Sequence, residues 1–130
     1  MQVLVDTSVW IDFFRRISSR ETELFKQALE RREQIFVAGI IAQEILQGIR
    51  QDSHYRSVLQ YLLLFSRIDD EFGDYLAAAN IYRSLRKRGL TIRSPVDCLI
   101  AALAIKENVS LLHNDSDFTA IAQHFPLSVI

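Results

Sequence analysis

The chain has 130 residues, a net charge of −1 and a composition that is 49% hydrophobic and 24% charged. These values are typical of one globular domain with a buried core, and they exclude a disordered chain and a strongly basic nucleic-acid binder. The sequence has a single cysteine, no signal-peptide pattern and no apolar run of the roughly 18 residues that a membrane helix needs. We therefore expect a single domain over residues 1–130, with no membrane segment, in a reducing, cytoplasmic setting.

The first third of the chain alternates between strand and helix patterns. Residues 2–5 (QVLV) are consecutively apolar, as in a strand that is covered on both faces of a parallel sheet. Helical spacing begins at Val9 and again over residues 21–32. A second strand over residues 34–39 (QIFVAG) and a helix over residues 40–48 (IIAQEILQG) then follow.

The middle of the chain continues this alternation. Asp52 and Ser53 are typical N-cap residues for the next helix, and SRID at residues 66–69 has weak strand character. Asp69 or Asp70 then caps a long helix that ends at Gly89. The basic residues before this glycine complement the helix dipole or form a patch for a nucleic-acid backbone: Arg83, Arg86, Lys87 and Arg88.

The last third contains the most apolar helix. Ser94 as N-cap and Pro95 at the first helical position predict a helix over residues 95–108, and its composition predicts burial on several sides. A strand over 109–114, a short helix over 117–125 and a final segment with strand character over 127–130 complete the chain. Strands that alternate with helices predict an α/β fold, here a three-layer α/β/α sandwich with a central, mostly parallel sheet of four to five strands.

Acidic residues occur where such a sheet gathers ligands, beyond the carboxyl ends of its strands. Asp6 follows the first strand, Glu44 lies among isoleucines in a helix, Asp97 opens the most apolar helix, and Asp115 and Asp117 follow the fourth strand. Each alone has an ordinary explanation as a helix cap or a solvent-facing residue. Together they are expected to converge on one cleft, where repelling carboxylates share a divalent cation. Oxygen donors favour Mg²⁺ or Mn²⁺ over Zn²⁺, and such a site suits phosphodiester hydrolysis.

These acids lie in the segments VLVDTSVWIDFFR, IIAQEILQGIR, SPVDCLIAALAI and LLHNDSDF. The segments resemble those of PIN-domain ribonucleases, specifically the VapC-type toxins of bacterial and archaeal toxin–antitoxin pairs, and the resemblance covers essentially the whole chain. It implies that Asp6, Glu44, Asp97 and Asp115 are catalytic, metal-binding acids, with Asp117 as a further metal-binding acid. The implied activity is that of a Mg²⁺- or Mn²⁺-dependent endoribonuclease that cuts RNA, commonly a tRNA or rRNA stem-loop, and inhibits translation.

The same resemblance implies supporting residues and partners. Thr7, Ser8 and Asn114 are expected as polar support around the metal, and a homodimer and a VapB-type antitoxin are the implied protein partners. One set of apolar residues either lines a groove for an antitoxin helix or is ordinary core: Tyr55, Val58, Leu59, Leu62, Leu63, Phe65, Trp10, Phe13 and Phe14. A set of basic residues either lines the RNA path or serves the helix ends: Arg15, Arg16, Arg50, Arg86, Lys87 and Arg88.

Other interpretations fit the sequence less well. A phosphotransfer hydrolase of the haloacid-dehalogenase type needs a second aspartate two residues after the first, where this chain has Ser8. A receiver domain needs a lysine after its fifth strand, and none can be placed there. The remaining alternative is a non-catalytic PIN-like module that binds RNA or protein, although such a module has no need of mutually repelling carboxylates.

Overall fold

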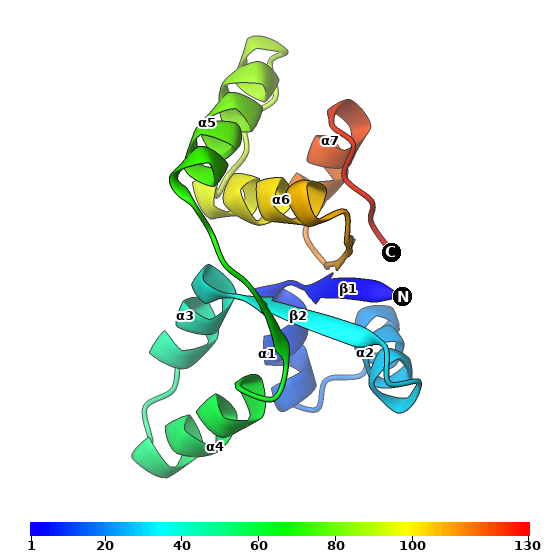
Figure 1. Ribbon diagram of the computed structural model, residues 1–130, viewed down its shortest axis with the longest axis vertical. Helices are drawn as coiled ribbons and strands as arrows, with labels where there is room; N and C mark the ends of the chain where they lie inside the picture. Colours follow the sequence, from blue (N-terminus) through cyan, green and yellow to red (C-terminus); the bar gives the residue numbers. More distant parts are fainter.

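The computed structural model describes residues 1–130 and places a parallel sheet between two layers of helices (Figure 1). The strands are β1 (Gln2–Val5), β2 (Gln34–Ala38), β3 (Ser66–Ile68) and β4 (Ser110–Leu112), in the order β3-β2-β1-β4. All three strand pairings are parallel. The predicted α/β/α sandwich is confirmed, and β1 occupies a central position in its sheet.

Seven helices cover the two faces of this sheet (Figure 1). On one face lie α1 (Thr7–Phe14), α2 (Arg20–Glu30), α3 (Gly39–Gln47) and α4 (Asp52–Leu62), and on the other lie α5 (Phe72–Lys87), α6 (Pro95–Glu107) and α7 (Ser116–His124). Helix α6 packs against both α5 and α7 as well as β4, which explains why its sequence is apolar nearly all round. No helix has both the length and the apolar character needed to cross a bilayer.

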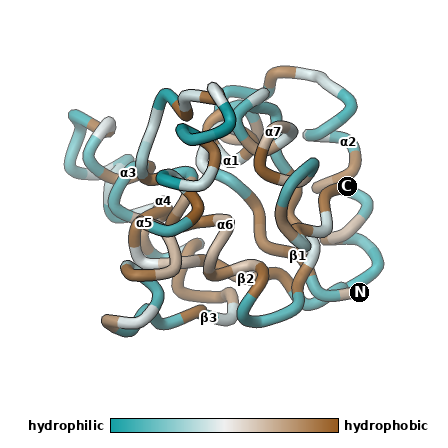
Figure 2. The backbone as a smooth tube through the Cα atoms, turned by 90° about the horizontal axis from the view of Figure 1, so that it is seen from above, coloured by the Kyte–Doolittle hydropathy of each residue, from teal (hydrophilic) through white to brown (hydrophobic).

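The hydrophobic core lies on both sides of the central strands. Val3, Leu4 and Val5 of β1 are each at most 2% exposed, because helices cover both faces of the strand. This burial explains the lack of alternation in QVLV. Figure 2 shows the same arrangement, with hydrophobic colouring along the strands and hydrophilic colouring in the outer loops.

Several predicted ends and caps are wrong by a few residues. Helix α4 has Gln51 as its N-cap, and α5 has Glu71 instead of Asp69 or Asp70. Glu71 takes this position because its backbone N–H donates to the Asp74 carboxylate at 2.8 Å. The predicted C-terminal segment 127–130 makes only an isolated bridge to β4 and is not a strand. Gly89 does follow α5 with a φ of 79°, as predicted.

The apolar residues predicted as groove or core divide between the two roles. Trp10 is completely buried, and its ring contacts aromatic rings from α1, α2 and the α4 region, so it belongs to the core. Val58 and Leu62 of α4 are buried as well. By contrast, Leu63 is 63% exposed and Tyr55 is 39% exposed. Of the two predicted alternatives, ordinary core therefore holds for Trp10, Val58 and Leu62, whereas Leu63 and Tyr55 are on the surface.

Candidate metal centre

Asp6 lies at the C-terminal end of β1, where α1 begins. Its backbone N–H donates to the Leu112 carbonyl of β4 at 2.9 Å, so sheet pairing continues to this residue. Its carboxylate accepts hydrogen bonds from the Ser8 hydroxyl at 2.7 Å and the Ser8 backbone N–H at 3.3 Å. Burial raises the pKa of Asp6 even though both hydrogen bonds act to lower it. Asp6 is thus a helix cap that also brings an energetically costly negative charge into the interior.

Asp97 lies in the first turn of α6, beside the loop between β4 and α7. One carboxylate oxygen each of Asp97, Asp115 and Asp117 lie within 4.8 Å of one another. The Oδ2 atom of Asp97 is buried and has no hydrogen-bond partner. Burial, followed by the charges of Asp115 and Asp6, raises the pKa of Asp97 to about 8. The structure therefore brings four of the predicted acids into one electrostatically coupled site.

The donor set of this site fits a hard divalent cation. All its charged donors are carboxylates, and a cation would satisfy the unpartnered Asp97 oxygen. The neighbouring Cys98 offers no competing soft ligand, because burial raises the pKa of its thiol to about 11. The cluster is therefore compatible with binding a divalent metal ion.

His113 stabilises the loop between β4 and α7 and is not one of the clustered candidate metal ligands. Its Nδ1 accepts the backbone N–H of Asp115 at 3.1 Å, and its ring lies 5.1 Å from that of Phe118. Burial lowers the pKa of the imidazole, which keeps Nδ1 available as an acceptor. Asn114, which was predicted as polar support, is exposed and lines an open polar hollow of about 340 Å³ together with His113 and Asp115.

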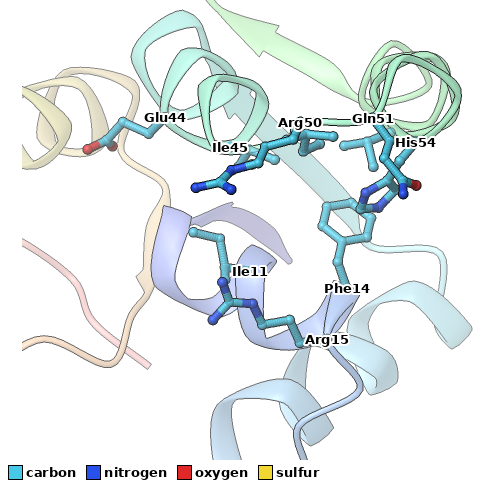
Figure 3. Close-up of a pocket in the computed structure, with 11 residues that line it drawn as sticks. Ile11, Phe14, Arg15, Glu44, Ile45, Arg50, Gln51 and His54 are labelled. Atoms are coloured by element: carbon cyan, nitrogen blue, oxygen red, sulfur yellow. The ribbon is translucent and has the colours of Figure 1, made fainter.

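Glu44 lies beside this cluster and outside the group of three close carboxylates. Its carboxylate accepts a hydrogen bond from the Thr7 hydroxyl at 2.8 Å, which links α3 to the residue directly after Asp6. Thr7 and Ser8, the two hydroxyl residues predicted as polar support, are thus each hydrogen-bonded to a different acid. In Figure 3, Glu44 lies at one end of a pocket of about 240 Å³ and His54 lies at the other.

That pocket runs between α1, α3 and the start of α4. Its lining combines apolar side chains with two cations, Arg15 after α1 and Arg50 after α3 (Figure 3). The apolar members of the lining are Ile11, Phe14, Ile45, Ile49 and Val58. A pocket lined by apolar side chains and two arginines suits a partner that has both apolar and acidic side chains.

Arg93 is a site residue that the sequence analysis missed. Its guanidinium lies 3.5 Å from Asp115 and 3.7 Å from Asp117. A cation directly before a helix start is unfavourable with respect to the helix dipole. In the sequence, the position of Arg93 directly before Ser94 and Pro95 is therefore the pattern that could have predicted an acidic partner for it.

Comparisons with known proteins show the family of this chain. The family model described as PIN domain matches residues 3–123. A VapC ribonuclease of Mycobacterium bovis is 39% identical over 124 residues, which covers 93% of this chain and 92% of the relative. The chain belongs to the PIN domain family, among the VapC ribonucleases.

Solved structures of toxin–antitoxin proteins have the same fold. The VapBC2 complex of Rickettsia felis, bound to a DNA fragment from its promoter, aligns with a TM-score of 0.78 at 19% identity. That alignment covers 100% of this PIN domain and 98% of the matched chain. A toxin–antitoxin complex from Klebsiella pneumoniae aligns with a TM-score of 0.67 at 25% identity, over 98% and 95% of the two chains.

We predict that this PIN domain releases a proton when a cation binds to the acidic cluster. Because the pKa of Asp97 is raised to about 8, the cation-free site holds a proton at neutral pH that a bound cation must displace. The apparent affinity for Mn²⁺ should therefore fall as the pH is lowered from 8 to 6. Isothermal titration calorimetry in two buffers with different ionisation enthalpies measures the released proton. Equal heats in both buffers at pH 7 would contradict this prediction.

Proposed function

We propose that this PIN domain is the toxin of a VapBC-type toxin–antitoxin pair. It is an endoribonuclease that hydrolyses RNA with the help of Mg²⁺ or Mn²⁺ and thereby inhibits translation. Its similarity to a VapC ribonuclease over 93% of the chain supports this assignment. The observation that carries the chemistry is the buried, unpartnered oxygen of Asp97 within a cluster of carboxylates.

Each site residue has a separate part in the proposed reaction. Asp6, Asp97 and Asp115 hold the cation, and Glu44 contributes from the α3 side. A bound cation lowers the pKa of a water molecule and offsets negative charge that develops on the phosphate. Ser8 orients Asp6, and Thr7 orients Glu44, through hydrogen bonds of 2.7 and 2.8 Å. The low exposure of Asp6 and Asp97 strengthens their attraction for a cation.

The proposed protein partners are a VapB-type antitoxin and a second copy of this chain. The antitoxin is assigned to the pocket between α1, α3 and α4, where it would meet Arg15 and Arg50 beside the acidic site. The second copy is assigned to the exposed apolar face of α5, where Phe72, Tyr75 and Leu76 are at least 50% exposed. No observation favours the alternative of a non-catalytic PIN-like module.

RNA cleavage tests the proposed activity. The purified chain, free of antitoxin, is incubated with total RNA in Mg²⁺ or Mn²⁺, and new 5′ ends are mapped. We expect discrete fragments, no fragments in EDTA, and none with Asp6→Asn. The matched control is Asp12→Asn, which neutralises an acid of the same helix that makes no side-chain hydrogen bond to the site. Binding of RNA without new 5′ ends, or fragments that persist in EDTA, would overturn the proposal.

A further inference from the structure

Asp117 differs from the other acids of the cluster in what its carboxylate contacts. Its Oδ2 accepts the backbone N–H groups of Arg93 and Ser94, at 3.0 and 3.4 Å. These two residues directly precede α6, whose first turn carries Asp97. We propose that Asp117 is a positioning residue, which fixes the start of α6 and so the location of Asp97, while Asp115 binds the cation. This inference rests on the proposed function and assigns different roles to the two acids of one loop.

The two acids differ in the donors that their carboxylates accept. Oδ1 of Asp115 accepts the Asp117 backbone N–H at 2.9 Å and the Arg93 guanidinium at 3.5 Å, and neither donor is a backbone group of the segment before α6. Both oxygens of Asp117 face the segment before α6, Oδ2 through its two N–H bonds and Oδ1 at 3.7 Å from the Arg93 Nε. Asp117 is also only 7% exposed. A cation that bound Oδ2 of Asp117 would have to displace these two backbone N–H groups, which would then lose their partner.

The start of α6 depends on this contact because it has no side-chain cap of its own. Ser94 occupies the N-cap position, but its hydroxyl makes no hydrogen bond to the helix. The Ser94 carbonyl instead accepts the backbone N–H of Asp97 at 3.0 Å. Asp117 therefore fixes Ser94, whose carbonyl accepts the hydrogen bond from Asp97. A loss of this contact would loosen Asp97, the metal-binding acid.

The same carboxylate joins the two helices that carry the site. Asp117 lies in the first turn of α7, and its backbone N–H donates to Oδ1 of the N-cap residue Asp115 at 2.9 Å. Asp117 is thus hydrogen-bonded both to Asp115 at the start of α7 and to the segment that precedes α6. The contact fixes the spacing between Asp97 and Asp115. Arg93 adds little to it, because its side chain is 74% exposed.

Three substitutions distinguish positioning from cation binding. Asp117→Asn keeps an amide oxygen that can accept the two backbone N–H bonds, whereas Asp117→Ala removes the acceptor, and Asp115→Asn neutralises the assigned ligand. We measure Mn²⁺ affinity by calorimetry and the hydrogen exchange of the Arg93 and Ser94 amides by NMR. Glu21→Gln is the control for charge, since Glu21 lines the same hollow as Asp115.

The expected order of effects is specific to a positioning role. Asp117→Asn should weaken Mn²⁺ binding by less than about tenfold and keep both amides protected. Asp117→Ala should weaken binding by about 10- to 100-fold and speed amide exchange, and Asp115→Asn should weaken it by about 100-fold or more without that acceleration. An Asp117→Asn variant as defective as Asp115→Asn would overturn the inference. These measurements need no RNA, so a failure of the proposed ribonuclease activity would be seen separately, as intact RNA with normal Mn²⁺ binding.

Discussion

Replacement of Asp97 by asparagine is expected to reduce RNA cleavage by about a thousandfold or more. Asp97 is the residue of the cluster with a buried, unpartnered oxygen, and its pKa is raised to about 8 by burial and by the charges of Asp115 and Asp6. An amide of the same shape preserves the packing around α6. It removes the negative charge that would attract the cation. Cleavage should therefore fail for lack of cation binding in a chain that is still folded.

The same substitution is expected to stabilise the cation-free protein. A carboxyl group whose pKa is raised on folding makes the folded state less stable as the pH rises from about 4 to about 8, because the unfolded chain ionises first. Asp97→Asn removes this penalty, so the variant should gain at least about 1 kcal/mol in the free energy of unfolding at pH 8. At pH 4, where Asp97 is protonated in the folded state and only about half ionised in the unfolded chain, the difference in stability should be much smaller.

Thermal denaturation in EDTA at pH 4, 6 and 8, together with a cleavage assay in Mn²⁺, measures both effects. Addition of saturating Mn²⁺ at pH 8 should raise the Tm of the parent chain and leave that of Asp97→Asn unchanged. Asp12→Asn is the control and should resemble the parent chain in every measurement. An Asp97→Asn variant that is less stable at pH 8 than the parent would show that Asp97 has a structural role and would contradict this account.

The sequence was most informative where one physical rule dominates. The consecutive apolar residues of β1 and the all-round apolar α6 could only be buried elements, and the structure confirms both. The convergence of Asp6 and Asp115 followed from the parallel topology, because the ends of neighbouring parallel strands meet at one edge. Asp97 joins them from the first turn of α6, which packs against β4. Helix starts were less predictable, since Asp69, Asp70 and Glu71 are adjacent acids and only the contact with Asp74 selects among them.

The separate roles of the acids could not be obtained from the sequence. Asp115 and Asp117 have the same chemistry and are two residues apart, and only the path of the backbone before α6 distinguishes their contacts. The role of Glu44 could not be predicted either, because its hydrogen bond with Thr7 depends on how α3 packs beside α1. Spacing within one element predicts which residues share a face, but contacts between loops depend on three-dimensional packing.

Replacement of Trp10 by alanine is expected to lower the free energy of unfolding by about 3–5 kcal/mol. Its ring is completely buried, stacks on Phe14 with centroids 5.8 Å apart, and meets Phe25 edge-on at 4.7 Å. The alanine would leave a large cavity between α1 and α2.

Trp10→Phe provides a variant that should fold and that separates packing from function. It keeps an aromatic ring and removes an indole N–H that has no hydrogen-bond partner, so the loss of stability should be only about 1–2 kcal/mol. Urea denaturation measures both values. The control is Phe72→Ala, at a residue that is 79% exposed, and it should change the free energy of unfolding by less than about 0.5 kcal/mol.

Because Trp10 fixes α1, which Asp6 caps, the cleavage rate should follow the folded fraction of each variant. A folded Trp10→Phe protein that cleaves RNA at a strongly reduced rate would show that the core also controls the geometry of the acids.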